Sequence, residues 1–304
     1  MKNYRYNFKN WFDADLEWKS GFLIKKFFPN ENLWKISDFF PKLTFFSVFG
    51  EKENIKKNRS KVKIFFTGED TSQNFTNYSD NCINDVDLSL GFASEESVNA
   101  KNYIRYPLWL LYYFGKYKTL PQIQQAINNF NSNWKEKTNA RFCSLVASHD
   151  KFGTRQKLCD ILNKIETVSS GGRIYHNDDS LLNDFGNNKE AYLKKFMFNL
   201  CPENVSSFGY VTEKIFQSLS AGCIPIYFGS CGVVENEIIE QSKIIVFNGT
   251  NESEVLEKVN NLWQNKEEYA KMFETPPIKA SAARWIYEKN LQLETKLNEI
   301  LKDL

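Results

Sequence analysis

The alternation of apolar and polar residues is clearest between Phe196 and Ser230. An apolar run at residues 196–200 is followed by a polar loop at 203–209. Apolar residues then recur at the spacing of one helix face, at Val211, Ile215, Phe216 and Leu219. Gly222 ends this helix as a C-cap would, and residues 223–228 form a second apolar run of strand length. The pattern therefore predicts a β-loop-α-β unit, a building block of α/β proteins.

Polar side chains fall where such a unit binds its ligands. In open α/β sheets, ligands lie beyond the carboxyl ends of the strands, where helix N-termini present free N–H groups. Asn204, Tyr210, Glu213 and Lys214 occupy that position. Each also has a structural interpretation: Asn204 as a turn residue, Tyr210 as a packing aromatic, and the two charged residues as ordinary first-turn helix residues.

Strands and helices alternate along the rest of the chain. Strands are expected near residues 1–15, 43–49, 62–66, 87–92, 142–147 and 243–247, and helices at 107–117, from Thr154 onwards, at 253–263 and at 291–304. The polar stretch 119–141 is the best candidate for a linker. We therefore predict an α/β fold with two facing Rossmann-like domains, 1–138 and 139–304, each with a parallel sheet. The last amphipathic helix is expected to pack back on the first domain.

Composition excludes several classes of protein. The 304 residues are 25% charged and 42% hydrophobic, with a net charge of +2, which is ordinary for a globular protein and gives no general attraction to nucleic acid. The first residues contain no apolar h-region, and no apolar run approaches the ~20 residues of a membrane helix, so we expect a soluble, cytoplasmic chain. The six cysteines form no C-x-x-C pair, which favours buried thiols over a disulfide or zinc framework.

Several segments resemble one family of enzymes. Residues 202–229, PENVSSFGYVTEKIFQSLSAGCIPIYFG, resemble the signature segment of the α1,3/4-fucosyltransferases, in which a strand ends in EN and is followed by GYVTEK or DYITEK, a helix and IPIYWG. Residues 65–75 resemble the family segment FYTGEN with a later NF, residues 103–113 resemble its R-Y-P-L segment, and residues 146–155 resemble its V-A-S segment with a following Arg. The resemblance extends from about residue 45 to 228 and implies a GT-B fold.

Binding of a nucleoside diphosphate sugar requires that two phosphates be neutralised. One route uses a divalent metal held by Asp-x-Asp, and this chain has that motif at Asp13/Asp15 and Asp85/Asp87, where turn carboxylates are the favoured interpretation. The other route uses cationic side chains and helix N-termini. Arg155 and Lys214 suit it, because each falls in the first turn of a predicted helix that follows a strand. We therefore expect neither metal nor cofactor.

The resemblance assigns roles to these residues. It implies that Ser148, Arg155, Asn204, Tyr210, Glu213 and Lys214 contact a GDP-fucose donor. A carboxylate in the position of Glu213 can accept both ribose hydroxyls. His149 stands where many family members have Asn, which leaves one local hydrogen bond open.

The reaction also needs a base for the acceptor hydroxyl. A carboxylate with a pKa near ~4.3 is ionised at neutral pH and can accept that proton. Glu69, just beyond the strand at 62–66, is the candidate, with a turn carboxylate as the alternative. The matching Glu of the family is implied to be the base, although Asp70 replaces the family's Asn. Arg105 and Tyr106 are interpreted as framework or acceptor-side residues.

The expected function is an inverting fucosyltransferase. It moves L-fucose from GDP-fucose to the 3-hydroxyl, or alternatively the 4-hydroxyl, of a GlcNAc or glucose unit in a glycan such as lactose or N-acetyllactosamine. The first domain would bind the acceptor and the second the donor. The alternatives are a transferase of the same fold that uses another nucleotide sugar and a non-catalytic glycan- or nucleotide-binding module.

Overall fold

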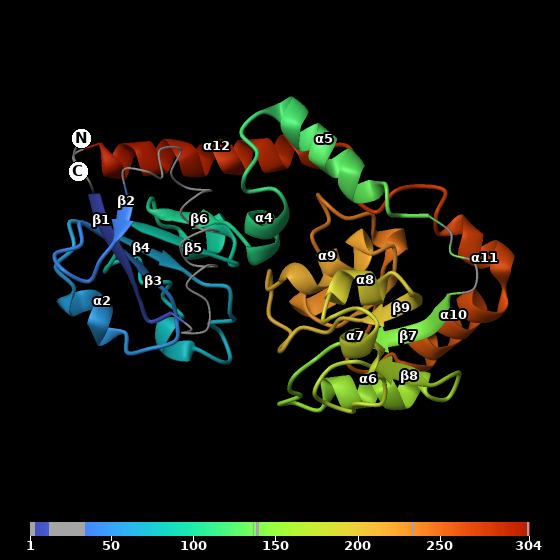
Figure 1. Cartoon of the computed structure of the whole chain (residues 1–304). Helices are drawn as coiled ribbons and strands as arrows, with labels where there is room; N and C mark the ends of the chain where they lie inside the picture. Colours follow the sequence, from blue (N-terminus) through green and yellow to red (C-terminus); the bar gives the residue numbers. More distant parts are fainter. Residues whose placement is uncertain (1–3, 12–33, 136, 138–139, 233, 303) are drawn as a thin grey trace. The chain divides into compact units, whose positions relative to one another are not determined.

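A computed structural model describes residues 4–11, 34–135, 137, 140–232, 234–302 and 304. They divide into two compact units, each with its own parallel sheet (Figure 1). The first unit comprises Met1–Ile123 and Arg284–Leu304, and the second comprises Gln124–Ala283. The boundary between the two units therefore falls after Ile123, earlier than the predicted boundary at residue 138. The C-terminal segment from Arg284 belongs to the first unit and not to the second.

The first unit contains six parallel strands in the order β2-β1-β3-β4-β5-β6. They are β1 Tyr4–Lys9, β2 Trp34–Ile36, β3 Leu43–Phe46, β4 Val62–Phe66, β5 Leu88–Gly91 and β6 Tyr103–Arg105. The predicted strands at 43–49, 62–66 and 87–92 are confirmed, and the first predicted strand is shorter than expected. The sequence missed β2 and β6, because both are three-residue edge strands, too short for a periodic pattern.

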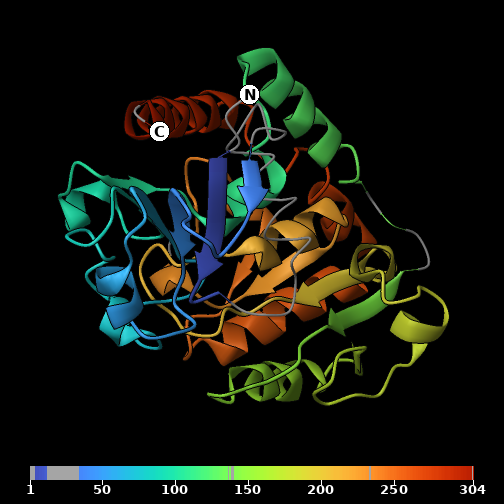
Figure 2. The ribbon, with the colours of Figure 1, turned by 60° about the vertical axis from the view of Figure 1, so that its left-hand side comes forward.

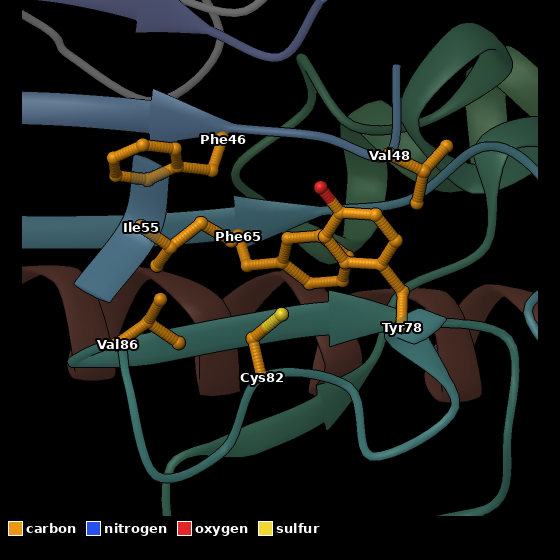
Figure 3. Close-up of a cluster of buried hydrophobic side chains, with 7 residues drawn as sticks. All are labelled: Phe46, Val48, Ile55, Phe65, Tyr78, Cys82 and Val86. Carbon is orange, nitrogen blue, oxygen red and sulfur yellow. The ribbon is translucent and has the colours of Figure 1, made fainter. Parts of the chain in front are cut away.

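Short helices connect these strands or follow the last of them. They are α2 Glu53–Lys57, the 3₁₀ turn η3 Thr76–Tyr78, α3 Glu95–Val98 and α4 Leu108–Tyr113, which begins after Pro107 as predicted. Beneath α2 and η3 lies a cluster of buried side chains on one face of the sheet (Figure 3). Its members are Phe46, Val48, Ile55, Phe65, Tyr78, Cys82 and Val86. Phe46 and Phe65 are register partners on β3 and β4, so both rings point to the same face.

The C-terminal helix α12, Ala282–Leu301, packs on the first unit, which confirms the prediction. Tyr106 is buried and its hydroxyl donates to Asn290 Oδ1 at 2.7 Å. The Asn290 amide in turn donates to the carbonyl oxygens that end α4 and the following turn. Trp285 stacks on Trp109 with ring centroids 6.0 Å apart. Tyr106 is therefore a framework residue, as one of its two interpretations proposed.

The second unit contains five parallel strands in the order β11-β10-β9-β7-β8. They are β7 Arg141–Leu145, β8 Val168–Ser170, β9 Phe196–Leu200, β10 Ile224–Tyr227 and β11 Ile245–Val246. The helices are α6 Thr154–Leu162, α7 Ser180–Asn183, α8 Lys189–Leu193, α9 Glu213–Ser220, α10 Glu252–Gln264 and α11 Lys266–Lys271, with 3₁₀ turns at Ser230–Gly232 and Gln241–Lys243. The predicted β-loop-α-β unit is confirmed as β9, α9 and β10.

Helices cover both faces of this second sheet. α6 lies beside α10 on one face and α8 beside α9 on the other, as Figures 1 and 2 show. The strand order explains the arrangement, because successive right-handed crossovers that run in opposite directions place their helices on opposite faces. The order changes direction between β7 and β9, and such a switch point is where ligands bind in open α/β sheets.

The segment 119–141, predicted as a linker, contains the boundary between the two units, which falls after Ile123, and it also contains a helix that the sequence did not predict. Residues Leu120–Asn131 form the helix α5. Its buried positions are Ile123, Ala126, Ile127 and Phe130, which repeat at helix spacing. The surrounding Gln and Asn residues dilute this narrow apolar stripe, so the segment reads as polar in the sequence. In the part of the chain that the structure describes, no helix is long and apolar enough to cross a membrane.

Candidate functional site

The candidate site lies at the carboxyl ends of β7 and β9. These strands are parallel neighbours with Leu145 opposite Leu200, so the loops that follow them leave the sheet at the same edge. The first loop leads into α6 at Thr154 and the second into α9 at Glu213. Two helix N-termini, with their unpaired N–H groups and positive dipole ends, therefore begin beside one edge of the sheet.

Arg155 is held in this site by contacts with both loops. Its Nη2 donates to Asn204 Oδ1 at 3.0 Å, and its Nη1 donates to the carbonyl oxygen of His149. The side chain is buried, with only 6% of the residue exposed. Burial lowers the pKa of Arg155, while the carboxylates of Asp150 and Glu203 act in the opposite direction. The structure thus brings together two residues that the sequence predicted separately. Because the acceptor at position 149 is the backbone carbonyl oxygen, Arg155 can make this hydrogen bond whether the residue is His or Asn.

Glu203 is a site residue that the sequence analysis missed. Its side chain is completely buried, and its Oε2 lies 2.8 Å from Lys214 Nζ. Thr212 donates to the same carboxylate from its backbone N–H at 2.7 Å and from its hydroxyl at 2.9 Å. The one signal in the sequence is the pair of opposite charges at the two ends of a loop that joins a strand to a helix. Glu203 therefore ties the end of β9 to the start of α9.

The first turn of α9 is organised around Thr212. This residue is the N-cap, and its hydroxyl accepts hydrogen bonds from both the backbone N–H and the Nζ of Lys214. Glu213 occupies the first helical position and is half-buried. On the same helix Gln217 Oε1 accepts a hydrogen bond of 2.7 Å from Lys189 Nζ. Burial lowers the pKa of Lys189, and the Glu213 carboxylate counteracts this shift.

Tyr210 and Ser148 differ in their exposure. Tyr210 is buried at 2% exposure, and its carbonyl oxygen accepts a hydrogen bond from the Tyr227 hydroxyl at 3.4 Å. Its packing role is therefore observed, and its contact with a donor stays a prediction. Ser148 is exposed, with its Oγ 3.1 Å from His149 Nδ1.

Glu69 lies in the first unit, in the turn after β4. Its backbone N–H donates to Thr67 Oγ1 at 3.0 Å, and its carbonyl oxygen accepts from the same hydroxyl at 2.7 Å. The neighbouring Asp70 is buried and accepts hydrogen bonds from Ser72 Oγ, Gln73 N and Asn74 N. Asp70 thus stabilises the loop through backbone donors, and the side chain of Glu69 is half-buried.

The Asp85/Asp87 motif lies away from the sheet edge that carries Glu69. Asp87 precedes β5, at the opposite end of the strands from Glu69, and its Oδ2 accepts a hydrogen bond from the Lys63 backbone at 2.7 Å. Asp13 and Asp15 lie outside the described residues. Within the described ranges, no three His, Cys, Asp or Glu side chains gather in a way that could hold a metal ion.

Comparison with known proteins gives two family matches. The family model for glycosyltransferase family 10 (fucosyltransferase) C-term matches residues 133–284, half of the chain. The family model for the alpha-(1,3)-fucosyltransferase FucT N-terminal domain matches residues 6–112. The two matches fall on the second and first sheets respectively.

The individual relatives have low sequence identity to this chain. The chain is 27% identical to alpha-(1,3)-fucosyltransferase FucT of Helicobacter pylori over 289 residues, which is 84% of this chain and 55% of that relative. It is 32% identical to alpha-(1,3)-fucosyltransferase B of Drosophila melanogaster over 133 residues, which is 41% of this chain and 30% of that relative. The chain thus spans about half the length of these curated relatives, or less.

Solved structures share the fold. A crystal structure of an α1,3-fucosyltransferase covers 97% of this chain and 92% of its own, with a TM-score of 0.66 and 20% identity. An α1,3-fucosyltransferase with GDP-fucose has a TM-score of 0.63 and 21% identity and covers 95% of this chain and 90% of its own. The GT-B class with two parallel sheets is therefore confirmed. Together with the family matches in both halves, this shows that the chain belongs to glycosyltransferase family 10, the fucosyltransferases.

Proposed function

We propose that this protein transfers L-fucose from GDP-fucose, with inversion, to the 3-hydroxyl of a GlcNAc or glucose unit in a glycan acceptor. The observation that supports it most is the pair of anchored cations at one sheet edge. Arg155 is held by Asn204, and Lys214 is held by Glu203, each at the start of a helix. This arrangement suits a diphosphate, because two cations and two helix N-termini face the same small region.

The site is preorganised for the negative charge of a leaving diphosphate. When the bond between fucose C1 and the phosphate oxygen breaks, the electron pair goes to GDP and its charge increases. Arg155 and Lys214 are fixed before the donor binds, so they stabilise this charge without reorganising. Glu203 offsets part of the positive charge and so limits the cost of keeping two partly buried cations together.

The remaining groups hold the rest of the donor. Glu213 is proposed to accept hydrogen bonds from the ribose hydroxyls, since a carboxylate offers two acceptor oxygens. Asn204, Tyr210 and Ser148 are proposed to contact the base, the ribose or the fucose. No metal ion is needed in this scheme, because the cations and helix N-termini supply the charge that a metal would otherwise provide.

Glu69 is proposed as the general base. Inversion by a single displacement requires that the acceptor hydroxyl lose its proton as its oxygen bonds to fucose C1. The proton passes to the Glu69 carboxylate, the new glycosidic bond forms, and GDP leaves. The backbone of Glu69 is fixed by Thr67, which suits a group that must meet an acceptor hydroxyl at hydrogen-bond distance.

The test is a donor and acceptor panel. GDP-fucose, GDP-mannose and UDP-GlcNAc are each combined with lactose and N-acetyllactosamine, and product anomers and linkages are assigned by NMR. We expect transfer from GDP-fucose alone, an inverted anomer and a 3-linked product. Selective use of another donor would identify a related transferase, a product fucosylated at a hydroxyl other than the 3-hydroxyl would correct the regiochemistry, and donor binding with no transfer to any acceptor would indicate a binding module.

A chelator test addresses the metal. We expect the rate to persist in excess EDTA. If EDTA abolished transfer and added manganese restored it, the metal-free scheme would be contradicted. The two Asp-x-Asp motifs would then be the candidate metal sites.

A further inference from the structure

An exposed aromatic surface lies at the same sheet edge as Glu69 in the first unit. β3 and β4 are parallel neighbours with Phe46 opposite Phe65. Phe49 follows the end of β3 by three residues, and Glu69 follows the end of β4 by three residues. The two therefore lie beyond the carboxyl ends of adjacent strands. Phe49 is 40% exposed, so part of its ring is accessible at this edge.

Phe49 is part of a pair of rings. Phe75 makes an edge-to-face contact with it, with centroids 5.5 Å apart and an interplanar angle of 79°. Phe75 also packs against the buried cluster of Figure 3, so the ring that supports Phe49 is itself held by the core of the first unit. The Phe75 backbone N–H donates to the carbonyl oxygen of Asp70 at 3.2 Å. The aromatic pair is thus connected directly to the residue that follows Glu69.

The backbone that carries Phe49 is fixed as well. Its N–H donates to the carbonyl oxygen of Asn10 at 2.9 Å, and the next carbonyl oxygen, of Gly50, accepts from the Tyr78 hydroxyl at 2.8 Å. A Cβ atom at Gly50 would come within 2.4 Å of Asn10 Oδ1, so any larger residue would require the Asn10 side chain to move. Phe49 is therefore held in an exposed position by its surroundings.

We propose that Phe49, backed by Phe75, is the platform on which a pyranose ring of the acceptor glycan packs. This inference rests on the proposed function of Glu69. A general base works only at hydrogen-bond distance from its hydroxyl, so the acceptor sugar must lie within about one ring of Glu69. Binding sites for small molecules combine aromatic walls with a few polar groups, and a sugar presents an apolar C–H face to the first and hydroxyls to the second.

Direct binding of the acceptor tests this proposal. The dissociation constant for N-acetyllactosamine is measured by NMR titration in saturating GDP, for the wild-type protein and for Phe49→Ala, Phe49→Leu and Phe49→Tyr. We expect the constant to rise about tenfold in the Ala and Leu variants and to stay within twofold in the Tyr variant, which keeps the ring. GDP affinity should not change, because the proposed donor residues belong to the second unit, and the thermal midpoint is measured to show that each variant is folded.

Phe39→Ala is the matched control. Phe39 is 77% exposed and belongs to the same unit, but it follows the edge strand β2, which β1 separates from β3 and β4. It should leave acceptor binding unchanged. Unaltered binding in Phe49→Ala, or wild-type affinity in Phe49→Leu, would overturn the aromatic platform. Because binding is measured without turnover, a protein that binds acceptor through Phe49 but transfers no fucose would refute the proposed function and leave this inference standing.

Discussion

The ammonium group of Lys214 lies 2.8 Å from the completely buried carboxylate of Glu203. The two residues come from opposite ends of the loop that joins β9 to α9. Because Thr212 donates twice to the same carboxylate and also caps α9, one acidic side chain fixes both the cation and the helix start. Orientation of the donor site therefore depends on a residue that is proposed to touch no substrate.

Glu203→Gln is expected to weaken both folding and donor binding. The amide cannot neutralise Lys214, so we expect unfolding in urea to become easier by about 2 kcal/mol and the Kd for GDP to rise. The control is Glu190→Gln, which breaks an exposed Glu–Lys pair in the same unit and should cost less than about 1 kcal/mol. Equal effects of the two variants would show that Glu203 has no special role.

Arg155→Ala is expected to raise the Kd for GDP roughly thirty- to hundredfold, because it removes a charged hydrogen bond to the phosphate. Arg155→Lys should recover little of this, because Lys lacks the planar fork that reaches both Asn204 and the His149 carbonyl. Calorimetric titration with GDP measures both variants. Lys164→Ala removes an exposed cation just beyond the other end of α6 and should leave the Kd unchanged.

The sequence singled out the two cations of the proposed donor site but not the carboxylate that holds one of them. Arg155 and Lys214 were found because each stands in the first turn of a helix after an apolar strand, and both signals are local. Glu203 was missed because a carboxylate in a polar loop resembles a solvated turn residue. Only the close approach of the end of β9 to the first turn of α9 makes it buried and paired.

In the fold too, elements with a clear local pattern were predicted, and elements that depend on tertiary packing were not. The unit β9, α9 and β10 was predicted because strand and helix periods are both long enough to recognise. The helix α5 was missed because its four buried positions are separated by Gln and Asn, and their burial depends on tertiary packing. The edge strands β2 and β6 are three residues each and acquire their structure from pairing with neighbours.

We expect Asp178 to make the free energy of unfolding of the second unit depend on pH in the acid range. Burial raises the pKa of this carboxyl, but hydrogen bonds from Ser180, Tyr192 and Arg141 outweigh burial and lower the pKa to about 2. Since the folded pKa lies below the unfolded value, the stabilisation is present above about pH 4 and is lost as the pH falls towards 2.

The expected contribution of Asp178 is about 2 kcal/mol at neutral pH. Urea unfolding of the wild type and of Asp178→Asn at pH 7 and at pH 3 measures it, and the difference between the two proteins should shrink at the lower pH. A constant difference would mean that the ionised carboxylate is not the stabilising form. Asp179→Asn, at an exposed neighbour, serves as the control.

Cys231 is expected to be the one thiol that reacts quickly in the native protein. All six cysteines are free, and five of them are buried, as the sequence predicted. Burial raises the pKa of Cys82, Cys159 and Cys201 to about 12, so they hold almost no thiolate at neutral pH. Titration with a chromogenic disulfide should give one fast equivalent, and Cys231→Ser should abolish it. More than one fast equivalent would show that the buried sites open readily.

Glu69→Gln separates chemistry from donor binding. The amide keeps the size of the side chain but cannot accept the acceptor proton, so we expect fucose transfer to fall by roughly 10²- to 10⁴-fold. The Kd for GDP should not change, because the proposed donor residues belong to the second unit and Glu69 to the first. Glu96→Gln, at an exposed position in α3, is the matched control and should retain full activity. If the rate of Glu69→Gln matched the wild type, another group would have to take the proton, and the mechanism proposed for this fold would need a different base.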